Sequence, residues 1–400
     1  MTNETKTVLV LTTSFPVNEN IGAGIHVLGK CKQLVKNGWK VHVLAPSHVR
    51  SKKFEVIEGI NVKRFSYFFP ERYQKVAYGS GMPNNLKEST LAKIQLPFFF
   101  LSFLVNAIIY GKKCDIVHAH WFPAGLIGVF VKKIFNMKLV LMMHHPHKKN
   151  IIYKLILKNT DFLFANSSYV LKRTDEIFET KRKAILPVPI DYNQFKPDSD
   201  LRLIRRKHNI PDDFIFIFSA GRFINWKGFE YLIEAINLLV LDYSILNISL
   251  KIAGQGPNFK KYQDLINEKD IYKYVELIGY IPNSEMPNYY NEADIFVIPS
   301  IIDENGETEG FGVVSLEANA CRTPVVGSKV GGIVDVIKDG ENGFLVEQKN
   351  AEDLAEKLAK LIMNRSQREK MGEIGCEMVK NKFNWEIVGN KISDVYNDLI

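Results

Sequence analysis

Apolar runs of strand length alternate with helical stretches along almost the whole chain, and this alternation restricts the fold more than any other feature. In the first half the runs lie at residues 8–11, 41–44, 116–118, 139–143 and 162–165. In the second half they lie at residues 214–219, 248–252, 275–278, 295–298 and 324–326. Strands that alternate with helices form parallel sheets covered by helices. Because the pattern occurs twice, it predicts an α/β fold with two Rossmann-like, doubly wound domains.

The length of 400 residues suits two domains of similar size better than one core. Pro187 and Pro189 forbid regular structure near the middle of the chain and indicate a linker. We therefore place a first domain at residues 1–190 and a second at 191–375. Residues 376–400 have the pattern of a terminal helix, which is a candidate for packing back on the first domain.

Glu309 and Glu317 lie on either side of the start of a short predicted helix. Gly310 and Gly312 exclude Glu309 from a helix interior, so Glu309 belongs to a loop and Glu317 to the helix. The preceding apolar strand ends at Pro299, which places the loop at a strand's carboxyl end, where open α/β sheets bind ligands. A helix N-terminus offers unpaired N–H groups to an anion such as a diphosphate. Two acids that can hold hydroxyls there indicate a nucleotide-sugar site, although two solvated glutamates would give the same pattern.

Two further strand ends belong to the same predicted edge. Arg222 follows one strand and Lys227 precedes the next helix, where fixed cations can neutralise a diphosphate leaving group. Gly254 and Gly256 follow the next strand and permit a close approach of the backbone to a ligand. Alone, these residues are also compatible with surface cations beside a turn and with a plain loop.

A glycine pair also follows the first strand of the chain. Gly22 and Gly24 can bring backbone N–H groups to a phosphate or to an acceptor, although they match the full glycine-rich dinucleotide motif only in part. The pair is therefore a candidate ligand loop of the first domain.

The histidines permit a metal interpretation. His118 and His120 end a strand, as metal ligands of some hydrolases do, but such a site needs further ligands and no histidine follows His208. Residues 198–200 have the Asp-x-Asp form that holds a divalent ion in some sugar transferases, yet they precede a helical pattern and are typical of helix capping. We predict no metal site and keep a metal-dependent hydrolase as an alternative.

The net charge of +8 conceals a difference between the two halves. Residues 1–190 hold 28 Lys and Arg against 11 Asp and Glu, whereas the remainder holds 24 against 33. A basic half suits nucleic acid, an anionic membrane or an acidic substrate, and no nucleic-acid-binding motif is present. The apolar stretch at 94–110 is shorter than the roughly 20 residues of a spanning helix, so it is either a buried or half-buried helix or an interfacial helix. We expect an anionic membrane surface as a partner and no nucleic acid.

The four cysteines, Cys31, Cys114, Cys321 and Cys376, are far apart and form no Cys-x-x-Cys pair, so neither a disulfide framework nor a zinc site is indicated. The first apolar run is too short for a signal peptide. We therefore expect a cytoplasmic protein, peripheral on the inner leaflet of the cell membrane.

In chain order, a set of short segments resembles the retaining glycosyltransferases of the GT-B class, specifically glycosyl transferase group 1, or family 4. The segments are residues 22–24, 116–120, 140–144, 166–168, 221–222, 227–228, 254–257, 279–281, 299–300 and 309–317. These segments are distributed over nearly the whole chain, and the complete set in this order, ending in the two glutamates, is specific for the family. The resemblance implies two Rossmann-like domains that face a cleft, with the nucleotide-sugar donor held mainly by the second domain and the acceptor by the first.

The resemblance also implies residue roles. Arg222 and Lys227 would stabilise the departing nucleoside diphosphate without a metal or another cofactor. Glu309 would hold a hydroxyl of the transferred sugar, Glu317 the ribose hydroxyls, and His144 would face the anomeric centre or the sugar ring. The other donor-binding positions would be Gly22, Gly24, Gly254, Gly256, Tyr280, Ile281, Gly310, Phe311, Gly312, Val313 and Val314, with Tyr280 and Ile281 near the base.

Two positions depart from the family pattern. His145 stands where the family usually has a glycine, and the linker near Pro187 lacks the usual Asn-Gly pair. The resemblance still implies a retaining, metal-independent hexosyltransferase that acts on a glycan or lipid-linked acceptor in the synthesis of cell-surface polysaccharide or glycolipid. A nucleotide-sugar epimerase or phosphorylase of the same fold and a lectin-like glycan-binding protein remain alternatives.

Overall fold

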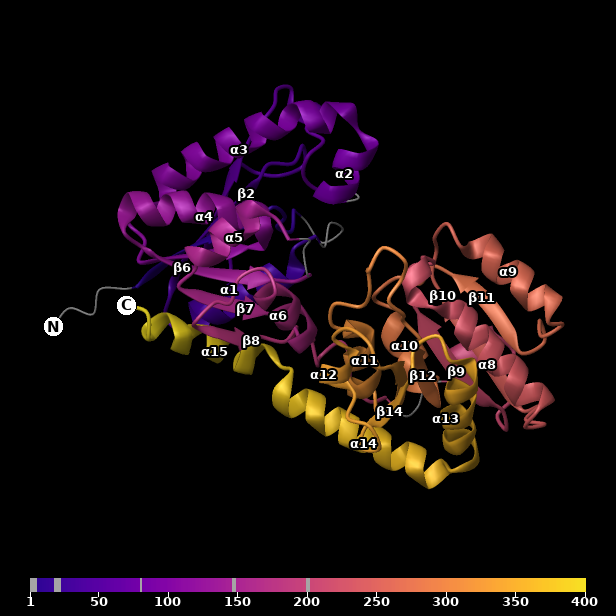
Figure 1. Cartoon of the computed structure of the whole chain (residues 1–400). Helices are drawn as coiled ribbons and strands as arrows, with labels where there is room; N and C mark the ends of the chain where they lie inside the picture. The colour runs from indigo at the N-terminus through magenta and orange to yellow at the C-terminus, as the bar shows by residue number, and fades with distance from the viewer. Residues whose placement is uncertain (1–5, 18–22, 80, 146–148, 199–201) are drawn as a thin grey trace. The chain divides into compact units, whose positions relative to one another are not determined.

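The computed structural model describes residues 6–17, 23–79, 81–145, 149–198 and 202–400. The chain forms two compact units, one made of Met1–Pro189 with Trp385–Ile400 and the other of Ile190–Asn384. Each unit has a sheet that is mainly or entirely parallel, with helices on both faces (Figure 1). The prediction of two doubly wound α/β domains is therefore confirmed.

The sheet of the first unit has eight strands in the order β3-β4-β2-β1-β5-β6-β7-β8, and β3 pairs antiparallel with β4. The strands are β1 Thr7–Leu11, β2 Lys40–Pro46, β3 Phe54–Ile57, β4 Ile60–Phe65, β5 Ile116–His120, β6 Lys138–Met143, β7 Phe162–Ala165 and β8 Lys183–Ile185. The helices are α1 Ile25–Lys36, α2 Met82–Glu88, α3 Thr90–Gly111, α4 Trp121–Phe135, α5 Ile151–Lys158, α6 Ser168–Asp175 and α15 Trp385–Asn397, with a 3-10 turn η1 at Glu71–Tyr73.

Helices cover both faces of this sheet, so its central strands β1 and β5 are buried along their whole length. On one face, Phe99 and Phe103 of α3 pack with α4 over the sheet, and on the other face α1 packs with α15. The crossing of α1 and α15 is close, because a Cβ on Gly29 would lie 2.2 Å from the ring of Trp385. The last helix of the chain therefore completes the core of the first unit.

The sheet of the second unit has six parallel strands in the order β11-β10-β9-β12-β13-β14. The strands are β9 Ile215–Ala220, β10 Ile248–Ala253, β11 Val275–Gly279, β12 Ile295–Ile298, β13 Val325–Ser328 and β14 Gly343–Val346. The helices are α7 Leu203–Lys207, α8 Phe229–Leu241, α9 Phe259–Glu268, α10 Met286–Glu292, α11 Val313–Ala320, α12 Ile333–Val336, α13 Ala351–Met363 and α14 Arg365–Lys382, with a 3-10 turn η2 at Asn225–Lys227. Residues 376–400 thus contain the end of α14 and all of α15.

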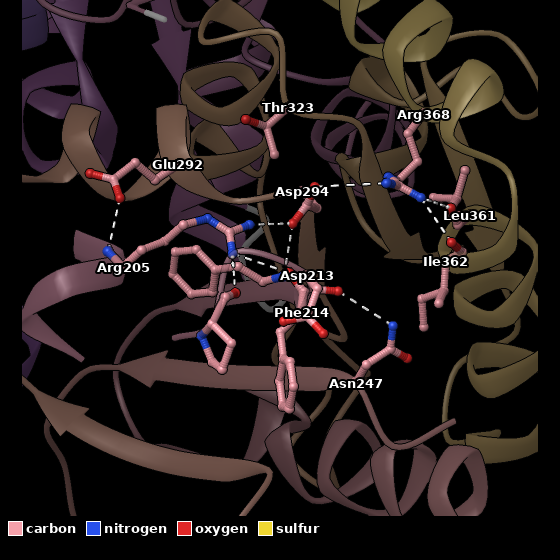
Figure 2. Close-up of polar contacts among 12 residues, drawn as sticks. Arg205, Asp213, Phe214, Asn247, Glu292, Asp294, Thr323, Leu361, Ile362 and Arg368 are labelled. Carbon is pink, nitrogen blue, oxygen red and sulfur yellow. Dashed lines mark hydrogen bonds and ion pairs between the residues drawn. The ribbon is translucent and has the colours of Figure 1, made fainter. Parts of the chain in front are cut away.

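An ionic network lies where β9 and β12 begin (Figure 2). Asp294, just before β12, accepts hydrogen bonds from Arg205 at 2.7 Å and from the backbone N–H of Phe216 at 2.8 Å. Arg368 donates to the last carbonyls of α13, including that of Leu361 at 2.6 Å. These charged groups pair with one another and with the backbone at the amino ends of the strands, opposite the edge where parallel sheets bind ligands. We therefore interpret the network as structural.

One local prediction is wrong. The helix around residues 94–110 runs from Thr90 to Gly111, so its 22 residues exceed the predicted length. The N-cap of α7 is Arg202, whose side chain makes no capping hydrogen bond, and the capping role given to residues 198–200 stays a prediction. Glu292 of α10 instead accepts hydrogen bonds from the backbone N–H groups of Ile204 and Arg205, each at 2.8 Å. Residues 199–201 themselves lie outside the described residues.

Candidate functional site

The strand order of the second unit places the expected ligand-binding crevice at the carboxyl ends of β9 and β12. The chain leaves β9 toward β10 on one side and leaves β12 toward β13 on the other, so the loops after β9 and β12 border a crevice at the carboxyl edge. The loops are in direct contact, because the N–H of Ile301 donates to the carbonyl of Trp226 at 2.8 Å. A Cβ on Gly228 would lie 2.1 Å from the carbonyl oxygen of Pro299, so only glycine permits this approach.

Lys227 and Glu309 form an ion pair across the two loops. Lys227 Nζ lies 2.5 Å from Glu309 Oε2, and the side chains are 11% and 15% exposed. Arg222 is exposed, and its guanidinium makes no hydrogen bond or ion pair within the described part of the chain. The structure therefore brings Lys227 and Glu309 together as predicted from the sequence, with a free cation on the same loop.

The segment between Glu309 and α11 is held by a glycine turn. Gly332 donates its N–H to the carbonyl of Glu309 at 3.0 Å. A Cβ on Gly331 would lie 1.9 Å from Glu309 O, and one on Gly332 would lie 2.3 Å from Gly310 O. The backbones of the two segments thus touch, which fixes the position of Glu309.

Helix α11 begins with free backbone donors. Its N-cap is Gly312, in the left-handed region at φ 84°, and no side chain caps the helix. The first-turn residues Val313 and Val314 are half-buried, and Phe311 is buried with its ring 6.1 Å from that of Phe383. Unpaired N–H groups at a helix start attract an anion.

Three buried hydroxyls border the same segment, one after β12, one just before Glu309 and one in the first turn of α11. They belong to Ser300, Thr308 and Ser315, and none has a hydrogen-bond partner among the described residues. Such hydroxyls in a native protein call for a water molecule or a ligand as a partner.

Glu317 projects from α11 and is hydrogen-bonded to a buried tyrosine. The hydroxyl of Tyr290 donates to Glu317 Oε2 at 2.8 Å. Desolvation by burial raises the pKa of Glu317 to about 7, against a smaller lowering by this hydrogen bond. The carboxyl group therefore changes charge near neutral pH, which suits a group that exchanges hydrogen bonds with ligand hydroxyls.

The other predicted donor residues lie at neighbouring strand ends. A Cβ on Gly254 would lie 1.9 Å from Gly221 O, and one on Gly256 would lie 2.5 Å from Phe223 O, so both glycines fit the loop of Arg222 against the end of β10. Tyr280, after β11, is 67% exposed, whereas Ile281 is buried. An exposed aromatic ring at this edge is free to contact a ligand.

The first unit has a corresponding switch point, between β1 and β5. A cavity of about 120 Å³ lies there, and its polar lining includes Thr12, Ser14, His26 and His120. Gly24 caps α1 at φ 84°, where a Cβ would lie 2.4 Å from Ser14 O. The predicted residue Gly22 lies outside the described residues.

His144 belongs to a cluster of histidines at this edge. Its Nε2 lies 3.5 Å from His120 Nδ1, and its ring lies 4.8 Å from that of His26 in an edge-to-face arrangement. Burial lowers the pKa of His144 and of His120 well below the usual value, and nearby Lys30 adds to the effect. These imidazoles are neutral at pH 7 and can exchange hydrogen bonds with hydroxyl groups.

Two buried groups beneath the cluster have unused hydrogen-bonding atoms. Lys30 is 1% exposed, and its Nζ finds no partner in the described part of the chain. His118 Nδ1 lies 2.6 Å from the hydroxyl of Tyr396, and its Nε2 has no partner there. Among the described residues, no group of three His, Cys, Asp or Glu side chains could hold a metal.

Several of these residues were not predicted from the sequence. Tyr290 and Lys30 carry no local signal, because a tyrosine and a lysine on helices are usually packing and surface residues. His26 could have been noticed two positions after Gly24, and the Gly331-Gly332 pair after β13 could have indicated a close backbone approach.

Two family models match the chain, one over each unit. "Glycosyltransferase Family 4" matches residues 21–194, and "Glycosyl transferases group 1" matches residues 200–378. Together they cover most of the sequence and both edges described above.

Curated relatives are glycosyltransferases as well. An uncharacterized glycosyltransferase of Methanocaldococcus jannaschii is 29% identical over 314 residues, which are 75% of this chain and 81% of the relative. The D-inositol 3-phosphate glycosyltransferase of Corynebacterium jeikeium is 27% identical over 77% of this chain and 79% of its own length. The capsular polysaccharide biosynthesis glycosyltransferase CapM of Staphylococcus aureus is 31% identical over 53% of each chain.

Solved structures show the same fold. Sucrose-phosphate synthase from Thermosynechococcus elongatus superposes with a TM-score of 0.77 at 21% identity, over 98% of this chain and 99% of that one. HepE of Anabaena, solved with UDP and glucose, gives a TM-score of 0.73 at 16% identity, over 98% of this chain and 100% of that one. With its two Rossmann-like units, the chain has the GT-B fold and belongs to the group 1, or family 4, glycosyltransferases.

Proposed function

We propose that this glycosyltransferase is a retaining enzyme that moves a sugar from a nucleoside-diphosphate sugar to a hydroxyl of a glycan or lipid-linked acceptor. The observation that carries the proposal is the Lys227–Glu309 pair beside the free guanidinium of Arg222 and the uncapped start of α11. Cations and backbone donors at one crevice suit a diphosphate, and the carboxylate suits a sugar hydroxyl.

In this proposal the second unit holds the donor. Arg222 and Lys227 balance the charge that develops on the departing diphosphate, together with the N–H groups of Val313 and Val314. Glu309 accepts a hydrogen bond from a hydroxyl of the transferred sugar, while the hydrogen bond from Lys227 holds the Glu309 carboxylate in place. Glu317 accepts from the ribose hydroxyls. Both glutamates are binding groups, and we assign no protein nucleophile.

The acceptor belongs to the first unit. The cavity of the first unit is lined by hydroxyl groups and neutral histidines, and such groups bind the hydroxyls of a ligand better than they bind its charged groups. His144 lies in the same cluster and is proposed to face the sugar ring. CapM acts in capsular polysaccharide biosynthesis, and this similarity supports an acceptor from cell-surface polysaccharide or glycolipid synthesis. Because donors of this class are cytoplasmic metabolites and the four cysteines are all free, we also propose a cytoplasmic location.

A thermal-shift panel of UDP-, GDP-, ADP- and CMP-sugars tests the donor site, and UDP-sugars come first because HepE was solved with UDP. We expect one class to raise the Tm of the wild type, and an Arg222→Ala, Lys227→Ala double variant to lose most of that rise. Lys360→Ala is the matched control, because it breaks an exposed pair with Glu356 on α13. A wild type that no nucleotide sugar stabilises would contradict the proposal.

Two further measurements test the reaction. With the donor identified above, ¹H NMR of the product should show the donor's anomeric configuration, and an inverted product would exclude retention. Because Arg222 and Lys227 supply the positive charge, the rate should persist in excess EDTA. A rate that falls with EDTA and returns with Mg²⁺ would overturn the proposed independence from metals.

A further inference from the structure

Helix α3 exposes an apolar face to solvent. Five of its exposed side chains, spaced four, three, four and four residues apart, lie along one side of the helix. They form the α3 stripe, which consists of Ile94 (58% exposed), Phe98 (52%), Leu101 (61%), Val105 (47%) and Ile109 (63%). The stripe extends over about 22 Å at 1.5 Å per residue. The opposite side of α3, which includes Phe99 and Phe103, is buried on the core.

The polar residues of α3 do not interrupt the stripe. Gln95 is buried and bonds the backbone, accepting from Lys75 N at 2.9 Å and donating to Tyr73 O at 2.7 Å. Ser102 donates to Ser66 O at 2.7 Å. No charged residue occurs between Lys93 and Lys112. A helix face that is exposed to water is normally polar, so the exposed apolar face of α3 indicates a binding site for an apolar partner.

Basic residues and a second apolar surface border the stripe. Lys93 lies at one end, and Lys112 and Lys113 lie at the other, all exposed. Beside the C-terminal end of α3, Tyr110 lines an apolar hollow of about 370 Å³ together with the exposed Phe54 and other residues of β2, β3 and β4. Residues 1–190, which make up most of the first unit, have a net charge of +17 from 28 basic and 11 acidic residues.

We propose that the α3 stripe docks the first unit on the surface of an anionic lipid bilayer. Apolar side chains of an interfacial helix enter the boundary between headgroups and acyl chains, and lysines at its ends bind anionic headgroups. By length and composition α3 could cross a membrane. However, its other face packs on the sheet through Phe103, whose ring stacks on Phe65 at 4.6 Å, so α3 lies along the bilayer. Figure 1 shows α3 at the outside of the first unit, next to α4.

A second copy of the chain suits this face less well than lipid. In a two-fold pair of α3 helices running antiparallel, Lys93 of each copy would approach Lys112 and Lys113 of the other, and like charges in contact disfavour association. An anionic bilayer pairs the same lysines with opposite charge. The proposal concerns the first unit alone and does not depend on the identity of the donor.

The test is flotation with vesicles of neutral phosphatidylcholine, with and without 30% phosphatidylglycerol, chosen as about a third anionic lipid. The stripe variant carries Phe98→Gln, Leu101→Gln and Ile109→Gln. The matched control removes equally exposed apolar side chains from the second unit through Leu241→Gln, Leu246→Gln and Met363→Gln, which are 67%, 55% and 72% exposed. A charge variant carries Lys93→Gln, Lys112→Gln and Lys113→Gln. Analytical ultracentrifugation of each protein gives the oligomeric state.

We expect the wild type and the control to float with anionic vesicles, the stripe variant to partition at least tenfold less, and the charge variant to lose the preference for anionic lipid. A wild type that does not float, or a stripe variant that floats equally well, overturns the proposal. A wild-type dimer that the stripe variant dissociates, without an effect of lipid, assigns the face to a second copy instead.

A second measurement covers the case in which the stripe variant fails to fold. Leu101→Cys in a Cys114→Ser background carries a polarity-sensitive fluorophore, because the other three cysteines are buried. Anionic vesicles should shift its emission to the blue. An unchanged spectrum contradicts the insertion of the stripe into lipid.

Discussion

Replacing Tyr290 with phenylalanine should weaken nucleotide binding in a way that depends on pH. The variant removes the hydroxyl that donates to Glu317 at 2.8 Å, while the ring keeps its contacts with Phe218 and Phe296. A hydrogen bond to a charged group contributes about 1.5–3 kcal/mol, and 1.36 kcal/mol corresponds to one pH unit in a pKa. The loss therefore raises the pKa of Glu317, already about 7 through burial, by about one pH unit or more.

The expected magnitude follows from the ionised fraction of Glu317. At pH 7.5 a carboxyl group with a pKa of about 7 is ionised in roughly three quarters of the molecules. A rise of about one pH unit leaves roughly one quarter ionised, and a rise of about two leaves roughly one thirtieth. If the ionised form binds the ribose hydroxyls, the Kd of the nucleotide should increase about threefold to about twentyfold and recover toward pH 9.

Isothermal titration at pH 6.5, 7.5 and 9 measures this effect. Tyr289→Phe is the matched control, because its hydroxyl lies on the same helix and bonds His208 Nε2 at 3.1 Å instead of Glu317. An unchanged Kd in Tyr290→Phe at pH 7.5 would show that the charge of Glu317 does not govern binding. A loss that persists at pH 9 would indicate a structural cause.

Three other predictions concern stability. The raised pKa of Glu317 favours the folded state below the unfolded pKa of 4.5 and is unfavourable above about 7. Glu317→Gln should therefore increase the free energy of unfolding at pH 8 by about 3 kcal/mol at most, but not at pH 4, and an equal gain in urea denaturation at both pH values would contradict this. Gly331→Ala, whose Cβ would lie 1.9 Å from Glu309 O, should lower the free energy of unfolding by more than about 2 kcal/mol and weaken donor binding. Gly340→Ala, at φ 78° in open space, should lower the free energy of unfolding by only about 1 kcal/mol. Similar denaturation midpoints for the two variants would refute the difference. Burial lowers the pKa of His118 to about 3, so the neutral histidine stabilises the fold above the unfolded pKa of 6.5, and this stabilisation is lost as the pH falls below 6.5. Hydrogen exchange in β5 and β6, corrected for the intrinsic rate, should therefore increase at pH 5 more than exchange in β9 and β10. Equal protection of the two pairs of strands at pH 5 would contradict this prediction.

The sequence predicted the central strands and the donor loop because those signals are local. A fully buried parallel strand is a continuous apolar run, and Gly310 and Gly312 confine Glu309 to a loop by themselves. The start of α11 at Val313 follows from the same glycines.

Strands β3 and β4 of the first sheet were missed because their residues are explained only by distant partners. β4 contains Arg64, which is 1% exposed, and a charged residue usually indicates a surface position. Its guanidinium is buried because it bonds Glu55 on β3 at 2.8 Å and the carbonyl of Pro16 at 2.6 Å. Periodicity cannot show such pairings. Likewise, Tyr290 and Glu317 meet only through the packing of α10 on α11.

The most direct test compares a nucleoside diphosphate with the matching monophosphate by isothermal titration. The wild type should bind the diphosphate more tightly, because in the proposed donor site Arg222, Lys227 and the start of α11 contact the second phosphate. In the Arg222→Ala, Lys227→Ala variant the preference should largely disappear, while monophosphate binding, which the proposal assigns to Glu317, should be retained. A diphosphate preference that survives in the double variant would place the phosphate contacts elsewhere and contradict the proposed donor site.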